Sequence, residues 1–276
     1  IYGLSIADQF VRTGMYKNVL LVGAEMHSMG LDFSTRGRNV TVIFGDGAGA
    51  VLVQPTEEEN QGILTTKLHS DGTYAEKLAF INPGAHGGYH HEKAGEKYDY
   101  GYPDSSEYGE MFITPHMLEN GQYYPNMEGQ FVFKLAVRKF PEVIMEALKT
   151  AGLEVSDIDM LVPHQANLRI AQFVQKTLRL SDNQVWNNIQ KYGNTSAATV
   201  PIALCEALEE GRVKPGDTLL TAAFGAGLTV GEEEKTEAPR DLSGRWSVHL
   251  RNSLGTKVCT FDIEQEDARL RGKILI

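Results

Sequence analysis

Apolar side chains recur at helical spacing in two long stretches of this chain. Residues 1–19 (IYGLSIADQFVRTGMYKNV) show the spacing from their first position, and no Ser, Thr, Asp or Asn precedes them as a helix cap. Residues 127–151 show the same spacing, and Gly152 stands where a helix would end. We therefore predict a helix in each stretch, and we expect the chain to begin inside the first one.

Short, uninterrupted apolar runs predict strands that are buried on both faces. The first run is NVLLVGAE (18–25), and GILTTKLHSDG (62–72) contains another. Between them, NVTVIFGDGAGAVLVQ (39–54) contains two runs around a glycine-rich hinge, which we interpret as a tight turn between strands. A phosphate-binding loop is the alternative for GDGAG, but such a loop opens a helix, whereas AVLVQ is typical of a strand.

In the second half of the chain, predicted strands alternate with predicted helices. The strands fall within residues 158–164, 184–193 and 217–230, and the helices fall within 167–180 and 196–211. This alternation predicts an α/β fold that is built in layers.

Three segments depart from this pattern. Residues from about 82 to 126 are rich in Gly, Tyr, His and acidic residues without a sustained period, which indicates a long surface insertion. Residues 232–240 (EEEKTEAPR) form a charged linker, and the remainder contains three alternating stretches that predict an antiparallel β meander. The predicted divisions are 1–126 including the insertion, 127–231, the linker 232–240 and a β-rich tail 241–276.

Composition narrows the class of protein. Of 276 residues, 42% are hydrophobic and 22% charged, and neither a membrane-spanning run nor a signal-peptide pattern is present, so we expect a soluble, cytoplasmic protein. The formal net charge of −10 argues against nucleic-acid binding.

Cys205 and Cys259 lie far apart without CxxC spacing, which predicts reduced thiols. The cluster of His86, His90 and His91 lacks a spacing that would orient metal ligands, so we predict no bound metal.

Two polar residues follow predicted strands of the second half. His164 comes directly after a strand and Pro163, and Asn194 stands between Gly193 and the start of a helix. Ligands and catalytic groups collect at the carboxyl ends of strands in α/β proteins. Both side chains are neutral donors at pH 7, which suits stabilisation of an enolate or a thioester oxyanion. Each also has a structural alternative, as an ordinary histidine after a strand or as a helix N-cap.

The order of the motifs favours the chemical interpretation. PHQANLRI, GNTSAA, VKPGD and FGAGLTVG follow one another, and FGDGAGAVLV and LHSDGT precede them. This series resembles the β-ketoacyl-ACP synthase III family over residues 1 to about 231, apart from the insertion. The resemblance implies a homodimer with the thiolase-like layered α-β-α-β-α fold. The N-terminal half would be incomplete, the C-terminal half nearly complete, and a short antiparallel β segment would follow.

The resemblance implies a 3-oxoacyl-ACP synthase III-type acyltransferase of fatty acid biosynthesis. An acyl-CoA primer would acylate a cysteine, and malonyl-ACP would lose CO2 and supply the carbanion, without any cofactor. His164 and Asn194 would donate hydrogen bonds to the malonyl thioester carbonyl. A backbone turn would form part of the oxyanion hole for acyl transfer, through Phe224, Gly225, Ala226 and Gly227. The family prefers glycine at the position of Ala226.

The resemblance also implies two sets of binding residues. Relatives line a pantetheine tunnel at the positions of Asn167, Gly129 and Phe133, and either Arg36 or Arg38 would meet the nucleotide end of CoA. 

Because the acyl carrier protein is acidic, an acidic enzyme needs a local basic surface to attract it. The candidates are Lys134, Arg169 and Lys176, of which the last two share one face of a predicted helix. The alternative for Lys176 is an ordinary solvated charge.

The sequence departs from the family pattern at both ends. The family's nucleophilic cysteine stands at a helix N-terminus just before the segment that corresponds to IYGLSIAD, and this chain begins after it. Cys205 and Cys259 are not credible replacements, so we expect no acyl-enzyme on the chain as given. The family's last strand is shortened or replaced. Two alternatives stay open: a non-catalytic thiolase-fold subunit that binds acyl thioesters, and a related ketide or hydroxymethylglutaryl-type synthase.

Overall fold

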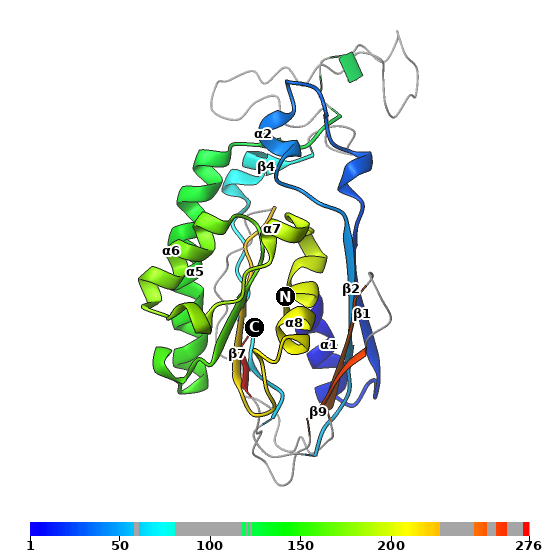
Figure 1. Cartoon of the computed structure of the whole chain (residues 1–276). Coiled ribbons are helices and arrows are strands. Elements are labelled where there is room, and N and C mark those ends of the chain that lie inside the picture. Colours follow the sequence, from blue (N-terminus) through cyan, green and yellow to red (C-terminus); the bar gives the residue numbers. More distant parts are fainter. Residues whose placement is uncertain are drawn as a thin grey trace.

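Sheets and helices alternate as layers in this protein (Figure 1). The structure, a computed structural model, describes residues 1–57, 61–80, 118–119, 121, 123–226, 246–252, 258–263 and 273–275. Its α-helices are α1 (Tyr2–Arg12), α2 (Arg38–Thr41), α5 (Gly129–Ala151), α6 (Leu168–Leu178), α7 (Ile189–Tyr192) and α8 (Thr199–Glu209). Its 3₁₀ turns are η1 (His27–Met29), η2 (Gly72–Lys77), η3 (Val155–Asp157), η4 (Asp182–Gln184) and η5 (Ser196–Ala198).

Among the described residues, the strands form two four-stranded sheets and one small pair. They are β1 (Val19–Glu25), β2 (Gly47–Val53), β3 (Ile63–Thr65), β4 (Leu78–Ala79), β5 (Asn126–Met127), β6 (Met160–Pro163), β7 (Thr218–Ala222), β8 (Trp246–Asn252), β9 (Val258–Ile263) and β10 (Lys273–Leu275). The first sheet has the order β1-β2-β8-β9 and is antiparallel throughout. The second has the order β3-β10-β7-β6 and is parallel throughout. β4 and β5 form the separate pair.

The layers follow the order sheet, helices, sheet, helices. Helices α1 and α8 share one core with both sheets, which joins Ala7 of α1 and Ala203 of α8 to Val53 of β2 and Val162 of β6. Helices α5 and α6 cover the opposite face of the second sheet through a second core (Figure 1). The predicted α/β layered class is confirmed, with four of the five expected layers among the described residues. On the outer face of the first sheet, Leu20 and Val22 of β1 are 65% and 57% exposed.

The helix predicted at 127–151 is present as α5, whereas the one predicted at 1–19 is present as α1 only from Tyr2 to Arg12, because the chain turns after Thr13 and enters β1 at Val19. Helix α5 ends as expected, because Gly152 takes the left-handed conformation (φ 69°) that costs glycine least. Asn167 caps the start of α6, because its side-chain oxygen accepts a hydrogen bond from the backbone N–H of Arg169 at 2.9 Å. None of the described helices is long and apolar enough to cross a membrane.

Two of the predicted strands are wrong. The first run of 39–54 begins with the short helix α2, and β2 starts inside the GDGAG sequence at Gly47, so no tight turn joins two strands there. A strand, and not a helix, does follow GDGAG, as expected. Within 184–193, Val185 makes only an isolated bridge to Leu161, and the chain then turns into α7.

The tail strands belong to both sheets. β8 and β9 form the expected antiparallel pair, and β8 adds to the edge of β2. β10 instead lies between β3 and β7, parallel to both, so a three-stranded meander is wrong for the last strand. The linker 232–240 and most of the insertion at 82–126, including its histidine cluster, lie outside the described residues.

Candidate active site

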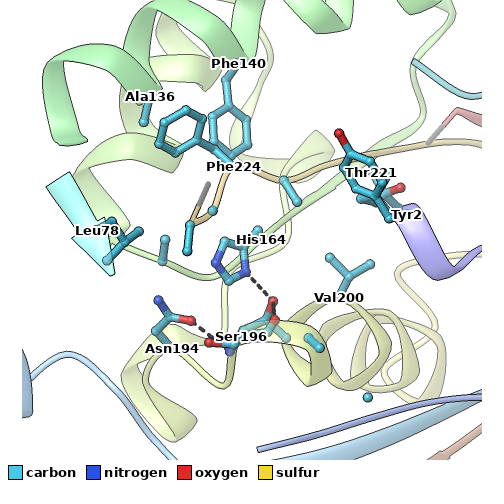
Figure 2. A pocket seen from close by; sticks show the side chains of 18 of the residues that line it. Tyr2, Leu78, Ala136, Phe140, His164, Asn194, Ser196, Val200, Thr221 and Phe224 are labelled. Carbon is cyan, nitrogen blue, oxygen red and sulfur yellow. Dashed lines mark hydrogen bonds between the residues drawn. The ribbon is translucent and has the colours of Figure 1, made fainter. Parts of the chain in front are cut away.

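A cavity of about 1100 Å³ lies where β6 and β7 end and α8 begins. Its lining is mostly apolar and includes His164 and Asn194. Figure 2 shows His164 between Phe224 and the segment that carries Asn194 and Ser196. The two polar residues singled out in the sequence, which come from different elements, therefore share one cavity.

His164 is held at the carboxyl end of β6. Its backbone N–H donates to the carbonyl of Ala222 in β7 at 2.8 Å, and its Nδ1 lies 2.5 Å from Oγ1 of Thr199 in α8. Burial is the main cause that lowers the pKa of His164 from its usual value to about 4. The imidazole is therefore neutral at pH 7, as expected for an uncharged donor.

Asn194 is fixed through both its backbone and its side chain. Its backbone N–H donates to Ile43 at 2.9 Å, and its carbonyl accepts from the N–H of Gly45 at 3.0 Å. Its Oδ1 accepts from the backbone N–H of Ser196 at 2.9 Å. Because the oxygen is engaged by this N–H, the side-chain amide group is left as the donor toward the cavity.

Glycine is required where the Asn194 segment meets the residues that follow α2. A Cβ on Gly45 would lie 2.0 Å from the carbonyl oxygen of Tyr192, which no real side chain tolerates. Gly193 has φ 68°, in the left-handed region, and a Cβ there would lie 2.9 Å from the carbonyl oxygen of Ile43. The glycines of FGDG and KYGN thus allow the close backbone approach that places Asn194.

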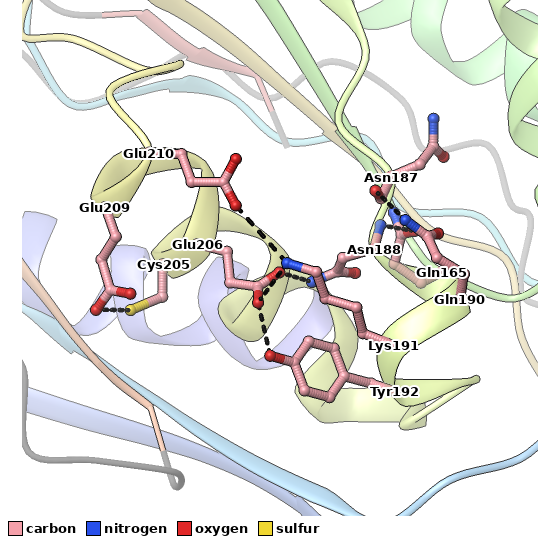
Figure 3. Close-up of polar contacts among 10 residues, drawn as sticks. All are labelled: Gln165, Asn187, Asn188, Gln190, Lys191, Tyr192, Cys205, Glu206, Glu209 and Glu210. Carbon is pink, nitrogen blue, oxygen red and sulfur yellow. Dashed lines mark hydrogen bonds and ion pairs between the residues drawn. The ribbon is translucent and has the colours of Figure 1, made fainter.

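A buried carboxylate ties α7, which precedes Asn194, to helix α8 (Figure 3). Glu206 accepts hydrogen bonds from Asn188 (2.8 Å), Lys191 (3.2 Å) and Tyr192 (2.6 Å). Burial alone would raise the pKa of Glu206, but these donors outweigh it and lower the pKa. The same contact raises the pKa of Tyr192 to about 12. The turn that presents Asn194 is thereby anchored to the central helix layer.

Most of the remaining residues that were expected to contact substrate line the same cavity. Phe224, Gly225 and Ala226 of the predicted oxyanion turn line the cavity, and Gly227 lies outside the described residues. Those assigned to the pantetheine tunnel also line it: Asn167, Gly129 and Phe133.

Arg36 and Arg38 differ in how they are held. Arg36 pairs with Asp32 at 2.6 Å, donates to the carbonyl of Glu119 at 2.9 Å and lies over the ring of Tyr124. Arg38 is exposed at the start of α2 and makes no ion pair with a described residue. Neither lines the cavity.

The three predicted docking residues are exposed on neighbouring helices. Lys134 lies on α5, and Arg169 and Lys176 lie on α6, which packs against α5. None of the three forms an ion pair within the part of the chain that the structure describes.

Cys205 is 1% exposed inside α8 and does not line the cavity, which agrees with its interpretation as a buried structural residue. Within the described ranges, no group of three or more His, Cys, Asp and Glu residues is placed to hold a metal ion.

Three polar residues at the cavity were not found from the sequence. Thr199 contacts His164, and Ser196, in the left-handed region at φ 44°, has its Oγ 3.0 Å from Nε2 of His27. The only sequence signal was their place after Asn194 in the run NTSAAT. His27 is far away in sequence, so only the fold could bring it to Ser196.

Two separate segments of the chain match models of one known protein family. The model of the family "3-oxoacyl-[acyl-carrier-protein (ACP)] synthase III" matches residues 1–72, and the model of the C-terminal part of that family matches residues 148–232. The β-ketoacyl-[acyl-carrier-protein] synthase III of Caldanaerobacter subterraneus subsp. tengcongensis is 45% identical over 229 residues, which are 83% of this chain and 61% of that protein. The enzyme of that name from Clostridioides difficile is 43% identical over 231 residues, or 84% of this chain and 62% of that protein.

Solved structures agree with these sequence matches. The 3-oxoacyl-[acyl-carrier-protein] synthase III of Aquifex aeolicus has a TM-score of 0.64 at 38% identity, over 83% of this chain and 60% of that one. The β-ketoacyl-ACP synthase III of Thermus thermophilus has a TM-score of 0.67 at 35% identity, over 83% of this chain and 61% of that one. This chain thus spans about three fifths of the length of these relatives.

Proposed function

This chain belongs to the 3-oxoacyl-[acyl-carrier-protein] synthase III family, and from that premise we propose that its cavity binds the malonyl group of malonyl-ACP and promotes its decarboxylation. The full reaction would be a condensation with an acyl-CoA primer in fatty acid biosynthesis, and no cofactor enters it. The observation that supports this proposal is the convergence of His164 and Asn194, two neutral donors, on one apolar cavity.

The chemistry requires a place for negative charge. When malonyl thioester loses CO2, the bond between the α-carbon and the carboxylate carbon breaks, and its electron pair moves onto the thioester to form an enolate. His164 and Asn194 would donate hydrogen bonds to the enolate oxygen. Donors that are already oriented and lie among apolar groups stabilise such charge without reorganising water, typically by a few kcal/mol each. In the full reaction, the enolate carbon would attack the acyl carbonyl of a primer held as a thioester on the family's nucleophilic cysteine. A carbon–carbon bond would form, the carbon–sulfur bond would break, and the cysteine would leave as the thiolate.

Removing the second donor tests the proposal. We expect the Asn194→Ala variant to release CO2 from malonyl-ACP more slowly than the wild type, by roughly 100-fold or more, because one oriented donor to the enolate is lost. The assay would follow radiolabelled CO2 from malonyl-ACP labelled in its free carboxyl group.

The matched control is Asn183→Ala, because Asn183 is exposed and outside the cavity. Equal rates for the two variants would contradict the role of Asn194. Binding of malonyl-ACP without CO2 release, even by the wild type, would instead favour a non-catalytic subunit that binds acyl thioesters.

The carrier protein would approach over α5 and α6. Lys134, Arg169 and Lys176 are exposed there, on a chain whose net charge is −10, so a local basic surface is needed to attract an acidic partner. Reversing these charges with Lys134→Glu or Arg169→Glu is expected to weaken binding of the carrier protein roughly tenfold, more at low than at high salt.

Lys149→Glu is the matched control for this surface. Lys149 is exposed on the same helix as Lys134 but at its opposite end, about 22 Å away at the rise of an α-helix. Binding measured by surface plasmon resonance should be unchanged in this variant. An equal loss in all three variants would show a general charge effect, and the docking surface would be rejected.

The primer's CoA would enter past α2. Of the two candidates, Arg38 is the one that is exposed and outside any ion pair among the described residues, which supports it over Arg36 as the contact to the nucleotide. The proposal extends to a cytoplasmic homodimer, as in the family resemblance. The mass of the protein in solution, measured by light scattering, decides between one chain and two.

A further inference from the structure

The hydroxyl group of Thr199 lies between two polar partners at the start of α8. Thr199 is 2% exposed, and its Oγ1 lies 2.5 Å from Nδ1 of His164 and 2.9 Å from the carbonyl oxygen of Ser196. A hydroxyl carries one hydrogen and a carbonyl can only accept. If the hydrogen goes to Ser196, the Nδ1 of His164 must carry its own hydrogen. If the hydroxyl donates to His164 instead, Nδ1 must accept and therefore carry no hydrogen.

The carbonyl of Ser196 does not need that hydrogen. It already accepts a hydrogen bond from the backbone N–H of Thr199, which closes the turn η5. Turning the hydroxyl away from Ser196 therefore leaves no buried acceptor unsatisfied, and the usual penalty for an orphaned polar group does not apply. The hydroxyl is free to donate to Nδ1 of His164.

His164 is neutral in its apolar surroundings, because burial lowers its pKa to about 4. A neutral imidazole carries one hydrogen, on Nδ1 or on Nε2, and the partner of one nitrogen decides which. Among the described residues, the hydroxyl of Thr199 is the polar side-chain partner of Nδ1. Figure 2 shows the other ring nitrogen pointing away from this contact.

We propose that Thr199 is a positioning residue that donates to Nδ1 of His164 and so keeps the ring hydrogen on Nε2, facing the cavity. This inference rests on the proposed function, in which His164 must donate to a thioester oxygen. In the opposite tautomer, Nε2 would present a lone pair to that oxygen and repel the developing enolate. A single hydroxyl thus decides whether the ring stabilises or opposes the charge.

The tautomer can be observed directly. Nitrogen chemical shifts of ¹⁵N-labelled imidazole separate a protonated from an unprotonated ring nitrogen, and a His164→Gln variant identifies the signal of His164 among the eight histidines. In the wild type we expect a protonated Nε2 and a bare Nδ1. In Thr199→Val, which keeps the shape but lacks the hydroxyl, we expect the two forms to mix or to invert. A protonated Nδ1 in the wild type would overturn the proposal.

Kinetics give a second readout. Thr199→Val is expected to lower kcat for malonyl-ACP decarboxylation by roughly 10- to 100-fold with little change in KM, since it disorients a donor used in the transition state. Thr199→Ser keeps a hydroxyl and should retain both the tautomer and most of the rate. Thr150→Val is the matched control, because Thr150 is exposed and, among the described residues, its hydroxyl donates to the carbonyl of Glu146 in its own helix.

The two readouts separate failure of this inference from failure of the proposed function. If the wild type shows a protonated Nε2 that Thr199→Val loses, the positioning role holds even when no CO2 is released, and only the proposed reaction is wrong. If CO2 is released but Thr199→Val changes neither the tautomer nor kcat, the positioning role is wrong while the reaction stands. A loss of kcat in Thr199→Val with an unchanged tautomer would also overturn it.

Discussion

Replacing His164 with alanine is expected to slow the decarboxylation of malonyl-ACP by roughly a hundredfold or more. The effect is large because the imidazole is held in place before any substrate arrives, by its backbone bond to Ala222 and its contact with Thr199. The variant leaves a space that an unoriented water molecule can fill only poorly. Release of radiolabelled CO2, measured at saturating malonyl-ACP, gives the rate.

A glutamine at position 164 is the informative control for the alanine variant. It keeps a neutral N–H donor on a side chain of similar reach, so His164→Gln should retain more activity than His164→Ala. Undiminished CO2 release by the alanine variant would contradict the assignment. The circular-dichroism spectrum of His164→Ala should match that of the wild type, which assigns the lost rate to the missing donor and not to misfolding.

The pKa of His164 adds a pH dependence to this prediction. With a pKa of about 4, the ring stays neutral from pH 8 down to about 5, so His164 should cause no change in rate over that range. An unfolded histidine has a pKa of about 6.5. The unfolded chain therefore binds a proton that the folded chain does not, and His164 destabilises the fold as the pH falls from 6.5 toward 4. A decarboxylation rate that falls as the pH is lowered, with its midpoint near pH 6.5, would indicate a solvent-exposed imidazole and contradict the burial of His164.

Replacing Gly45 with alanine is expected to reduce both stability and the decarboxylation rate. The new Cβ would lie 2.0 Å from the carbonyl oxygen of Tyr192, so the backbone must shift. Such overpacking costs about 1–3 kcal/mol, which corresponds to a fall in Tm of roughly 2–4 °C for each kcal/mol in a chain of this size. The shift would also disturb the hydrogen bond from Gly45 to Asn194, and the rate should fall toward that of Asn194→Ala.

Gly72→Ala is the matched control for this variant. A Cβ on Gly72 would meet nothing within 4 Å, so its Tm and rate should stay close to those of the wild type. Thermal unfolding followed by circular dichroism, together with the CO2 assay, measures both effects. A Gly45→Ala protein with normal Tm and normal rate would show that the approach of the two segments does not position Asn194.

Elements with a long and regular apolar period could be predicted from the sequence. The helix predicted at 127–151 is observed at Gly129–Ala151, and its end at Gly152 follows from the left-handed conformation that glycine adopts easily. The strand NVLLVGAE is observed as Val19–Glu25. In these segments the local preference of the backbone and the burial of the side chains favour the same structure.

Short apolar runs were predicted less well, because their pattern does not distinguish a strand from another buried segment. VWNN was expected in a strand, yet Val185 forms only an isolated bridge, and the chain then turns so that Asn188, Lys191 and Tyr192 can reach Glu206. Likewise β10 joins β3 and β7 in a parallel sheet, a pairing between distant segments that no local period indicates.

The order of the motifs was enough to select His164 and Asn194 as one pair and to identify the family, because each motif is local in the sequence. Their geometry depends on contacts between residues far apart in the chain. Asn194 is set by Ile43 and Gly45, about 150 positions earlier, and His164 by Thr199 on another helix. Hydrogen bonds of this kind, and the burial that holds the imidazole neutral, exist only after the layers have packed. The sequence by itself therefore singled out His164 and Asn194, and the tertiary structure decided that both line one cavity and which groups hold them there.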